Sequence, residues 1–142
     1  MSKRVLVIDA QGGGIGRLLV AGIKKEIPDL EVWAVGANHS AALAMKKAGA
    51  DETATGENAV IVCSRRVDII TGPIGIVIAD SMMGEITPAI AEAIGASDAI
   101  RVLVPMNRCS TVIAGVQNSA IGEMVRDAVA KIRIIAEGEI TN

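Results

Sequence analysis

Residues 4–17 read RVLVIDAQGGGIGR, an apolar run that leads directly into a cluster of glycines. The run from Arg4 to Asp9 has the length and the aliphatic side chains of a strand that is buried on both faces of a sheet. Beyond the glycines, apolar residues recur at the spacing of one buried helical face. They are Ile15, Leu18, Leu19, Gly22 and Ile23. A strand, a glycine-rich loop and a helix in this order are typical of a nucleotide-binding βαβ unit.

The glycine loop comprises Gln11, Gly12, Gly13, Gly14, Ile15 and Gly16. Glycines lack a Cβ atom and tolerate positive φ, so they let backbone N–H groups approach an anion closely. The helix that begins near Ile15 adds the positive end of its dipole at the same place. We therefore expect the loop to cradle the phosphates of a nucleotide. The alternative is a turn that merely lets the helix pack tightly on the sheet.

The loop matches known nucleotide-binding patterns only in part. In the G-x-G-x-x-G pattern, Gly13 and Gly16 match but Gln11 stands at the first position. The loop resembles more closely the T-G-x-x-x-G-x-G loop of short-chain dehydrogenases, in which Gly14 and Gly16 match. The D-x-G-x-G-x-G pattern of methyltransferases keeps Asp9 and fits worst. The fit favours a dinucleotide such as NAD(P) as the ligand.

Asp9 stands directly before this loop, and its carboxylate would repel a phosphate. At about 8 Å and an effective dielectric constant near 20, the repulsion is on the order of 2 kcal/mol. Either the carboxylate accepts hydrogen bonds from nearby backbone N–H groups, or it faces a ribose or a metal ion. We favour the local structural role.

Further apolar strands alternate with amphipathic helices along the chain, a pattern typical of a parallel sheet covered on both faces. Besides residues 4–9, strands are expected over residues 31–36, 50–55, 67–71, 101–105 and 111–116. Helices are expected from residue 15 to Pro28, and over residues 40–48, 57–65, 88–95 and 121–132, with Thr55 and Thr87 as N-caps. Residues 74–83 are apolar nearly all round and fit either a helix or a strand, and the helix is favoured. We therefore predict one doubly wound, Rossmann-like α/β domain over residues 1–142, with a mostly parallel six-stranded sheet of order 3-2-1-4-5-6.

The composition narrows the possible partners. The 142 residues carry a net charge of −2 and contain no Tyr or Phe. Such a chain has neither the basic surface nor the stacking platforms that nucleic-acid binding requires. No apolar stretch reaches membrane-spanning length, no leader pattern precedes the first strand, and the two cysteines form no disulfide framework. We expect a cytoplasmic protein that contacts neither nucleic acid nor membrane.

The end of the second strand lacks a feature of most NAD-binding domains. An acid usually stands there and binds a ribose hydroxyl, but residues 36–40 read GANHS. Asn38 could bind the ribose, and Asn38, His39 and Ser40 could receive a 2′-phosphate without the repulsion of an acid, which favours NADP over NAD. Alternatively, Asn38 or Ser40 simply caps the next helix. His39, the one histidine, is expected to be a polar surface residue.

Two other stretches follow strands at the same expected edge of the sheet. Gly72 and Pro73 follow the fourth strand and should face the glycine loop. Asn107 and Arg108 follow the fifth strand and are candidate ligand contacts. Arg108 would lower the pKa of the neighbouring Cys109 thiol, although a structural role for that cysteine is favoured.

Residues 80–87 read DSMMGEIT and interrupt an apolar region with polar groups and two methionines. Methionine adapts to varied shapes, so this stretch suits a pocket wall or a subunit interface. The apolar run before it favours the interface, and a homodimer is the expected assembly.

Several of these stretches together resemble one protein family. They are residues 7–16, 54–59, 72–76, 81–88 and 107–109. The family consists of short uncharacterised bacterial proteins and is catalogued as a domain of unknown function. Its opening usually has glycine where this chain has Ala10. The resemblance covers nearly the whole chain but implies no particular reaction, cofactor or catalytic residue.

Three hypotheses for the function follow. The first is a Rossmann-type domain that binds NAD(P), and that acts as a minimal oxidoreductase only if Asn107, Arg108 or a partner subunit supplies the catalytic groups. The Tyr-x-x-x-Lys catalysis of short-chain dehydrogenases is excluded, because the chain has no tyrosine. The second is a non-enzymatic sensor or regulatory subunit that binds a nucleotide or another phosphorylated metabolite. The third, a homo-oligomer without a ligand, leaves the glycine loop unexplained.

Overall fold

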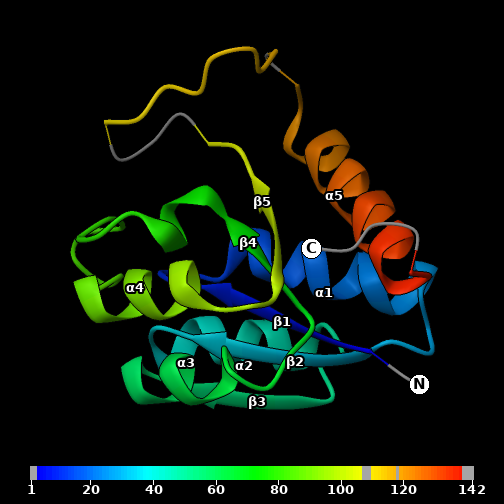
Figure 1. Ribbon diagram of the computed structural model, residues 1–142, viewed down its shortest axis with the longest axis horizontal. Coiled ribbons are helices and arrows are strands. Elements are labelled where there is room, and N and C mark those ends of the chain that lie inside the picture. The colour runs from blue at the N-terminus through cyan, green and yellow to red at the C-terminus, as the bar shows by residue number, and fades with distance from the viewer. Residues whose placement is uncertain (1–2, 107–109, 118, 139–142) are drawn as a thin grey trace.

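The computed structural model describes residues 3–106, 110–117 and 119–138. Its centre is one parallel five-stranded sheet of order β3-β2-β1-β4-β5 (Figure 1). The strands are β1 (Arg4–Asp9), β2 (Glu31–Gly36), β3 (Glu52–Thr55), β4 (Ile69–Pro73) and β5 (Ile100–Val104). This order agrees with the first five positions of the predicted one, and β1, the strand before the glycine loop, lies in the middle.

Helices cover both faces of the sheet. The elements α1 (Gly14–Glu26), α2 (His39–Lys47) and α5 (Ile121–Ala136) pack on one face. The other face is covered by α3 (Glu57–Cys63), α4 (Pro88–Ala96) and the short 3₁₀ helix η1 (Ile74–Val77). The predicted α/β class with a parallel sheet covered on both sides is therefore confirmed.

Strand β1 shows why the sequence specifies this layering. Val5 and Val7 point to the face of α1 and α5, whereas Leu6 and Ile8 point to the face of α3 and α4. All four side chains are completely buried. Burial of each contributes roughly 1.5–3 kcal/mol relative to exposure. A strand with two apolar faces is stable only between two layers, which is what the continuous aliphatic run predicts.

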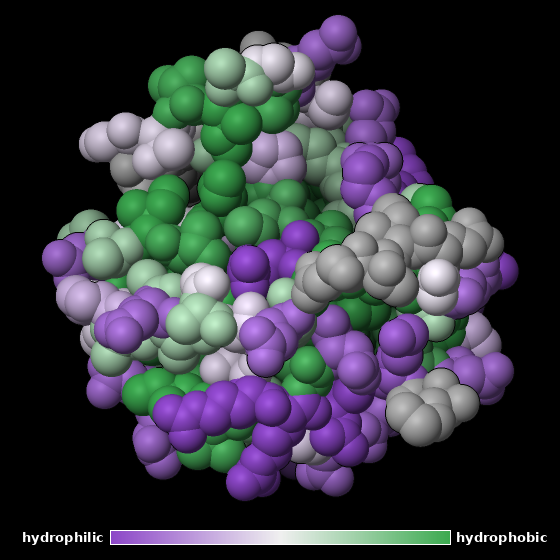
Figure 2. All heavy atoms as spheres, viewed as in Figure 1, coloured by the Kyte–Doolittle hydropathy of each residue, from purple (hydrophilic) through white to green (hydrophobic). Residues whose placement is uncertain are grey.

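The predicted sixth strand, over residues 111–116, is wrong. The described residues 110–117 form turns and irregular structure that project from the body of the domain, and Val112 is 86% exposed (Figures 1 and 2). Gly115, with φ of 81°, interrupts any extended run. A β-type sequence pattern reflects packing against neighbouring strands rather than an intrinsic backbone preference, and this segment does not pair with β5.

The predicted helix over residues 74–83 is also wrong. Only η1 is helical, and the chain then continues as a series of turns. Asp80, Met82 and Met83 have φ of 66°, 56° and 59°, which a right-handed helix cannot contain. The turns are closed by two backbone hydrogen bonds of Ile86, which is buried. An apolar run cannot distinguish a helix from such a buried coil by its periodicity.

Two smaller predictions need correction, and a third is confirmed. β4 runs over Ile69–Pro73 and so includes Gly72 and Pro73, which were expected to follow it; glycine is needed at position 72, because a Cβ there would lie 2.3 Å from the carbonyl oxygen of Ile8 on β1. α3 begins after Gly56 without a side-chain cap, so Thr55 is not its N-cap. Thr87 does cap α4, and its hydroxyl oxygen accepts a hydrogen bond from the Ile90 N–H at 3.1 Å.

Among the described residues, no helix combines the length and the apolar character needed to cross a membrane.

Substitution of Gly16 tests whether the close approach of α1 to β1 requires glycine at this position. A Cβ at Gly16 would lie 2.8 Å from the Cβ of Asp9 and 2.7 Å from the sulfur of Met45. We expect Gly16→Ala to lower the free energy of unfolding by about 1–3 kcal/mol, as overpacking does. Chemical denaturation monitored by circular dichroism measures it.

Gly14→Ala is the matched control for this substitution, because nothing lies within 4 Å of a Cβ at Gly14. Alanine is the better helix former, so the control should lose no stability. Equal stability of the two variants would contradict the expected steric conflict.

Candidate functional site

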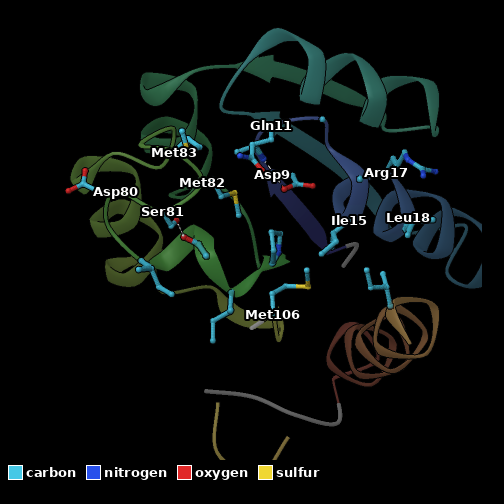
Figure 3. Close-up of a pocket in the computed structure, with 18 of the residues that line it drawn as sticks. Asp9, Gln11, Ile15, Arg17, Leu18, Asp80, Ser81, Met82, Met83 and Met106 are labelled. Atoms are coloured by element: carbon cyan, nitrogen blue, oxygen red, sulfur yellow. Dashed lines mark hydrogen bonds between the residues drawn. The ribbon is translucent and has the colours of Figure 1, made fainter. Parts of the chain in front are cut away.

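A cleft of about 870 Å³ opens at the carboxyl ends of β1 and β4. One wall consists of residues 9–12 and the exposed start of α1. The opposite wall consists of residues 73–75 and 78–83 (Figure 3). Met106, Ser110 and Ile121 complete the lining. The two walls thus come from the loops that follow adjacent parallel strands.

The position of the cleft follows from the order of the strands. From β1 the chain proceeds through β2 to β3 on one side, whereas β4 and β5 lie on the other side. The loops after β1 and β4 therefore diverge and leave a crevice between them. In open α/β sheets, ligands bind in such a crevice at the carboxyl ends of the strands.

The Asp9 side chain joins the end of β1 to the start of α1. Its Oδ1 accepts a hydrogen bond from the Ala10 N–H at 2.8 Å, and its Oδ2 accepts one from the Gly16 N–H at 2.7 Å. Burial raises the pKa of this carboxyl group, and Glu85 adds to the rise, while the backbone N–H groups of Gly16, Ala10 and Ile15 oppose it. The local structural role predicted for Asp9 is therefore confirmed.

The exposed part of the glycine loop lies at the surface of the cleft. Gly12 and Gly14 have open space where a Cβ would stand. Gly13 precedes α1 with φ of 71°, and a Cβ there would lie 3.0 Å from the Cα of Ala41. The loop therefore uses its glycines in two ways: Gly13 and Gly16 permit close packing, whereas Gly12 and Gly14 leave backbone open to the cleft.

A network of three residues holds the loop from the side of β2. The Asn38 Nδ2 group donates hydrogen bonds to the Gln11 carbonyl oxygen at 2.9 Å and to Glu85 Oε1 at 2.6 Å. The Gln11 N–H donates to the same Glu85 oxygen at 3.0 Å. Asn38 Oδ1 accepts from the Ala41 N–H at 2.9 Å, so Asn38 is the N-cap of α2. Both the Nδ2 group and the Oδ1 atom of Asn38 therefore form hydrogen bonds within the protein.

Arg17 is a residue of the cleft lining that the sequence patterns did not single out. It is exposed in the first turn of α1 and forms no ion pair within the described part of the chain. Its guanidinium points along the helix, away from Asp9 (Figure 3). A cation is unfavourable at the positive end of a helix. A positively charged residue in the first turn of a helix is therefore the sequence signal by which Arg17 could have been recognised as a candidate ligand contact.

The wall opposite the loop is largely apolar. Ile74, Ile78, Met82 and Met83 line it, and the side chain of Met83 is almost completely exposed. Ser81, also on this wall, is held by a hydrogen bond from its hydroxyl to the Gly75 carbonyl oxygen. Residues 80–83 thus line a pocket. This agrees with the first of the two interpretations of residues 80–87, a pocket wall or a subunit interface.

The structure brings together only some of the predicted contact residues. Those that line the cleft are Gln11, Gly12, Gly14, Ile15 and Pro73. Those that support it from behind are Gly13, Gly16, Asn38 and Gly72. Asn107, Arg108 and Cys109 lie outside the described residues, although Met106 and Ser110 on either side of them line the cleft.

The remaining polar candidates do not form a metal site. His39 is exposed at the first position of α2. In the part of the chain that the structure describes, no group of three or more His, Cys, Asp or Glu side chains could hold a metal ion.

Comparison with known proteins assigns the chain to a family. No curated protein matches it. Among solved structures, 20 chains match. One is the crystal structure of AibC, with 18% sequence identity and a TM-score of 0.44 over 96% of this chain; the match covers 42% of AibC, less than half of its length. A family model described as "Domain of unknown function (DUF3842)" matches residues 4–137. The chain therefore belongs to the DUF3842 family.

Proposed function

We propose that this protein is a Rossmann-type domain that binds an adenine dinucleotide with its phosphates on the glycine loop. NAD(P) is the first candidate for this ligand. The observation that carries the proposal is the cleft at the switch between β1 and β4, one wall of which is exposed glycine backbone at the start of α1. Backbone N–H groups and the positive end of a helix favour an anion there. The strand order 3-2-1-4-5 supports the proposal, since it agrees with the first five strands of the Rossmann order.

The size and lining of the cleft suit such a ligand. Its volume of about 870 Å³ falls within the roughly 300–1,000 Å³ of typical ligand pockets. The apolar wall with Met82 and Met83 offers contact area for a flat ring. Arg17 would reach a phosphate on the loop after rotating about its side-chain bonds, which exposed residues do within nanoseconds.

A non-enzymatic sensor or regulatory subunit is the second candidate, and the described chemistry of the cleft favours it. The titratable side chains in the described lining are Asp9, Arg17 and Asp80. Asp9 is committed to backbone N–H groups, and Arg17 stays charged at any physiological pH. No described lining residue is a histidine, cysteine or lysine that would serve as a general base near neutral pH.

Two further properties belong to the same proposal. The protein is expected to be cytoplasmic, and it is expected to form a homodimer. The exposed Met83 side chain at the mouth of the cleft is consistent with a partner subunit nearby.

Gly14→Asp tests the phosphate site without disturbing the fold. A Cβ added at Gly14 meets no atom within 4 Å, and a carboxylate in the first turn of a helix is favourable in the free protein. We expect the NAD(P) affinity to fall at least about tenfold, because two like charges about 6 Å apart repel by roughly 2–3 kcal/mol at an effective dielectric constant near 20. Isothermal titration calorimetry measures the affinity.

Gly14→Asn is the matched control, since it has the same shape without the charge. It should weaken binding by less than about threefold, that is by less than about 0.7 kcal/mol. A first screen by thermal shift, with NAD, NADP, FAD, S-adenosylmethionine, ATP and coenzyme A, should find one clear stabiliser, worth about 2.7 kcal/mol at a hundredfold excess over Kd. If no nucleotide stabilises the protein, the proposal fails. If both variants weaken NAD(P) binding equally, the phosphates do not bind beside Gly14.

The ionisation of Asp9 offers an independent test. Its pKa in the folded protein is raised above that of a free aspartate, chiefly by burial, so ionisation costs stability; this cost grows as pH rises from the unfolded to the folded pKa and is constant above the folded pKa. A pyrophosphate nearby would raise the pKa further, and NAD(P) affinity should therefore increase as pH falls through that pKa. Carboxyl ¹³C NMR titration, with and without saturating NAD(P), measures the shift.

Asp51 is the internal control for this titration. Its pKa is lowered, chiefly by the hydrogen bond from the Val32 N–H and also by Lys24, and it does not line the cleft. Its midpoint should stay the same when the ligand is added. An Asp9 midpoint that also stays the same would mean that the phosphates do not bind beside β1.

A further inference from the structure

Glu85 places a carboxylate beside the end of β2, where the local sequence has none. Residues 36–40 read GANHS, yet Glu85 Oε1 lies 2.6 Å from Nδ2 of Asn38, the second residue after the strand. Glu85 comes from the segment between η1 and α4, which the fold brings across the ends of β1 and β2. The acid missing after β2 is thus supplied from a distant part of the chain.

Two hydrogen bonds fix the position of this carboxylate. Glu85 Oε1 accepts from both the Asn38 amide and the Gln11 N–H, the latter at 3.0 Å. Gln11 lines the cleft, whereas Glu85 does not; the Glu85 carboxylate lies next to Gln11 on the side of β2, within hydrogen-bond distance of the Gln11 N–H. Within the described part of the chain, Glu85 Oε2 accepts no hydrogen bond and is free to accept one from a ligand.

A carboxylate at this place discriminates between the two forms of the dinucleotide. In dinucleotide-binding sheets, an acid at the end of the second strand accepts a hydrogen bond from the ribose 2′-hydroxyl of NAD. The 2′-phosphate of NADP carries negative charge at the same position, and like charges brought together across a binding interface cost several kcal/mol. Without Glu85, the GANHS stretch alone would tolerate NADP.

We propose that Glu85 is a specificity-determining residue that makes this protein select NAD over NADP. The inference rests on the proposed function, because it assumes that the phosphates of the dinucleotide lie on the glycine loop. It assigns the adenosine ribose to the side of Asn38 and Glu85, and the remainder of the ligand to the cleft beyond Gln11.

Calorimetric titration of the full chain with NAD and with NADP tests the proposal. We expect the wild-type protein to bind NAD at least about tenfold more tightly than NADP. Glu85→Gln keeps an oxygen that accepts from Gln11 and Asn38 but removes the charge. In that variant the two affinities should come within about threefold of each other, chiefly because NADP binds better.

Glu92→Gln is the matched control, because it changes the net charge by the same amount at an exposed position of α4. It should keep the wild-type preference for NAD. The wild-type measurement also decides the matter if Glu85→Gln does not fold, since equal binding of NAD and NADP by the wild type overturns the proposal.

Binding of either dinucleotide and selectivity between them are separate outcomes of these titrations. If neither NAD nor NADP binds, the proposed function falls and the selectivity inference falls with it. If both bind and the wild type shows no preference, or if Glu85→Gln keeps the preference unchanged, only the selectivity inference is overturned. In that last case Glu85 serves only to hold Gln11 and Asn38.

Discussion

The hydrogen bonds from Ala10 and Gly16 to the Asp9 carboxylate determine how the first strand is joined to the first helix. A buried carboxylate is costly unless its oxygens are satisfied, and here the backbone of the chain that follows satisfies them. The geometry requires α1 to start close to β1, which in turn requires glycine at position 16. The exposed backbone at the mouth of the cleft is held in place by this junction.

A second set of contacts connects the loop to the rest of the carboxyl edge. Asn38 follows β2, Gln11 follows β1, and Glu85 belongs to the chain that follows β4. Their hydrogen bonds therefore join the ends of three adjacent strands. Since Glu85 also contributes to the raised pKa of Asp9, the two sets of contacts interact electrostatically. The charge of the cleft border is a property of the whole edge rather than of the glycine loop alone.

Local patterns were enough to predict much of this architecture. The strand β1, the glycines after it and the amphipathic α1 each follow from neighbouring residues, and the cap of α4 by Thr87 is a contact over three positions. The parallel sheet with helices on both faces follows from the alternation of such units. The prediction that Asp9 would bind backbone N–H groups succeeded for the same reason, since its partners are Ala10 and Gly16.

The failures concern residues whose conformation depends on distant contacts. The apolar run at the start of residues 74–83 is compatible with a buried helix, but Asp80 and Met82 have left-handed conformations, and Met82 packs against the core on the side of α3 and α4. Residues 111–116 have the composition of a strand without a strand beside them. Glu85 could not be recognised from its neighbours, because its partners are Gln11 and Asn38, 74 and 47 positions away.

The central strand pairing has a consequence for the order in which the molecule folds. Arg4 at the start of β1 hydrogen-bonds to Asp68 just before β4, across 64 residues of chain. Contacts of such long sequence separation form slowly, because the entropy of closing a long loop must be overcome first. The unit from β1 to β3 contains the glycine loop but only one wall of the cleft. Because Glu85, which hydrogen-bonds to Gln11, also follows β4, both the second wall of the cleft and this support of the glycine loop are in place only after β4 has joined the sheet.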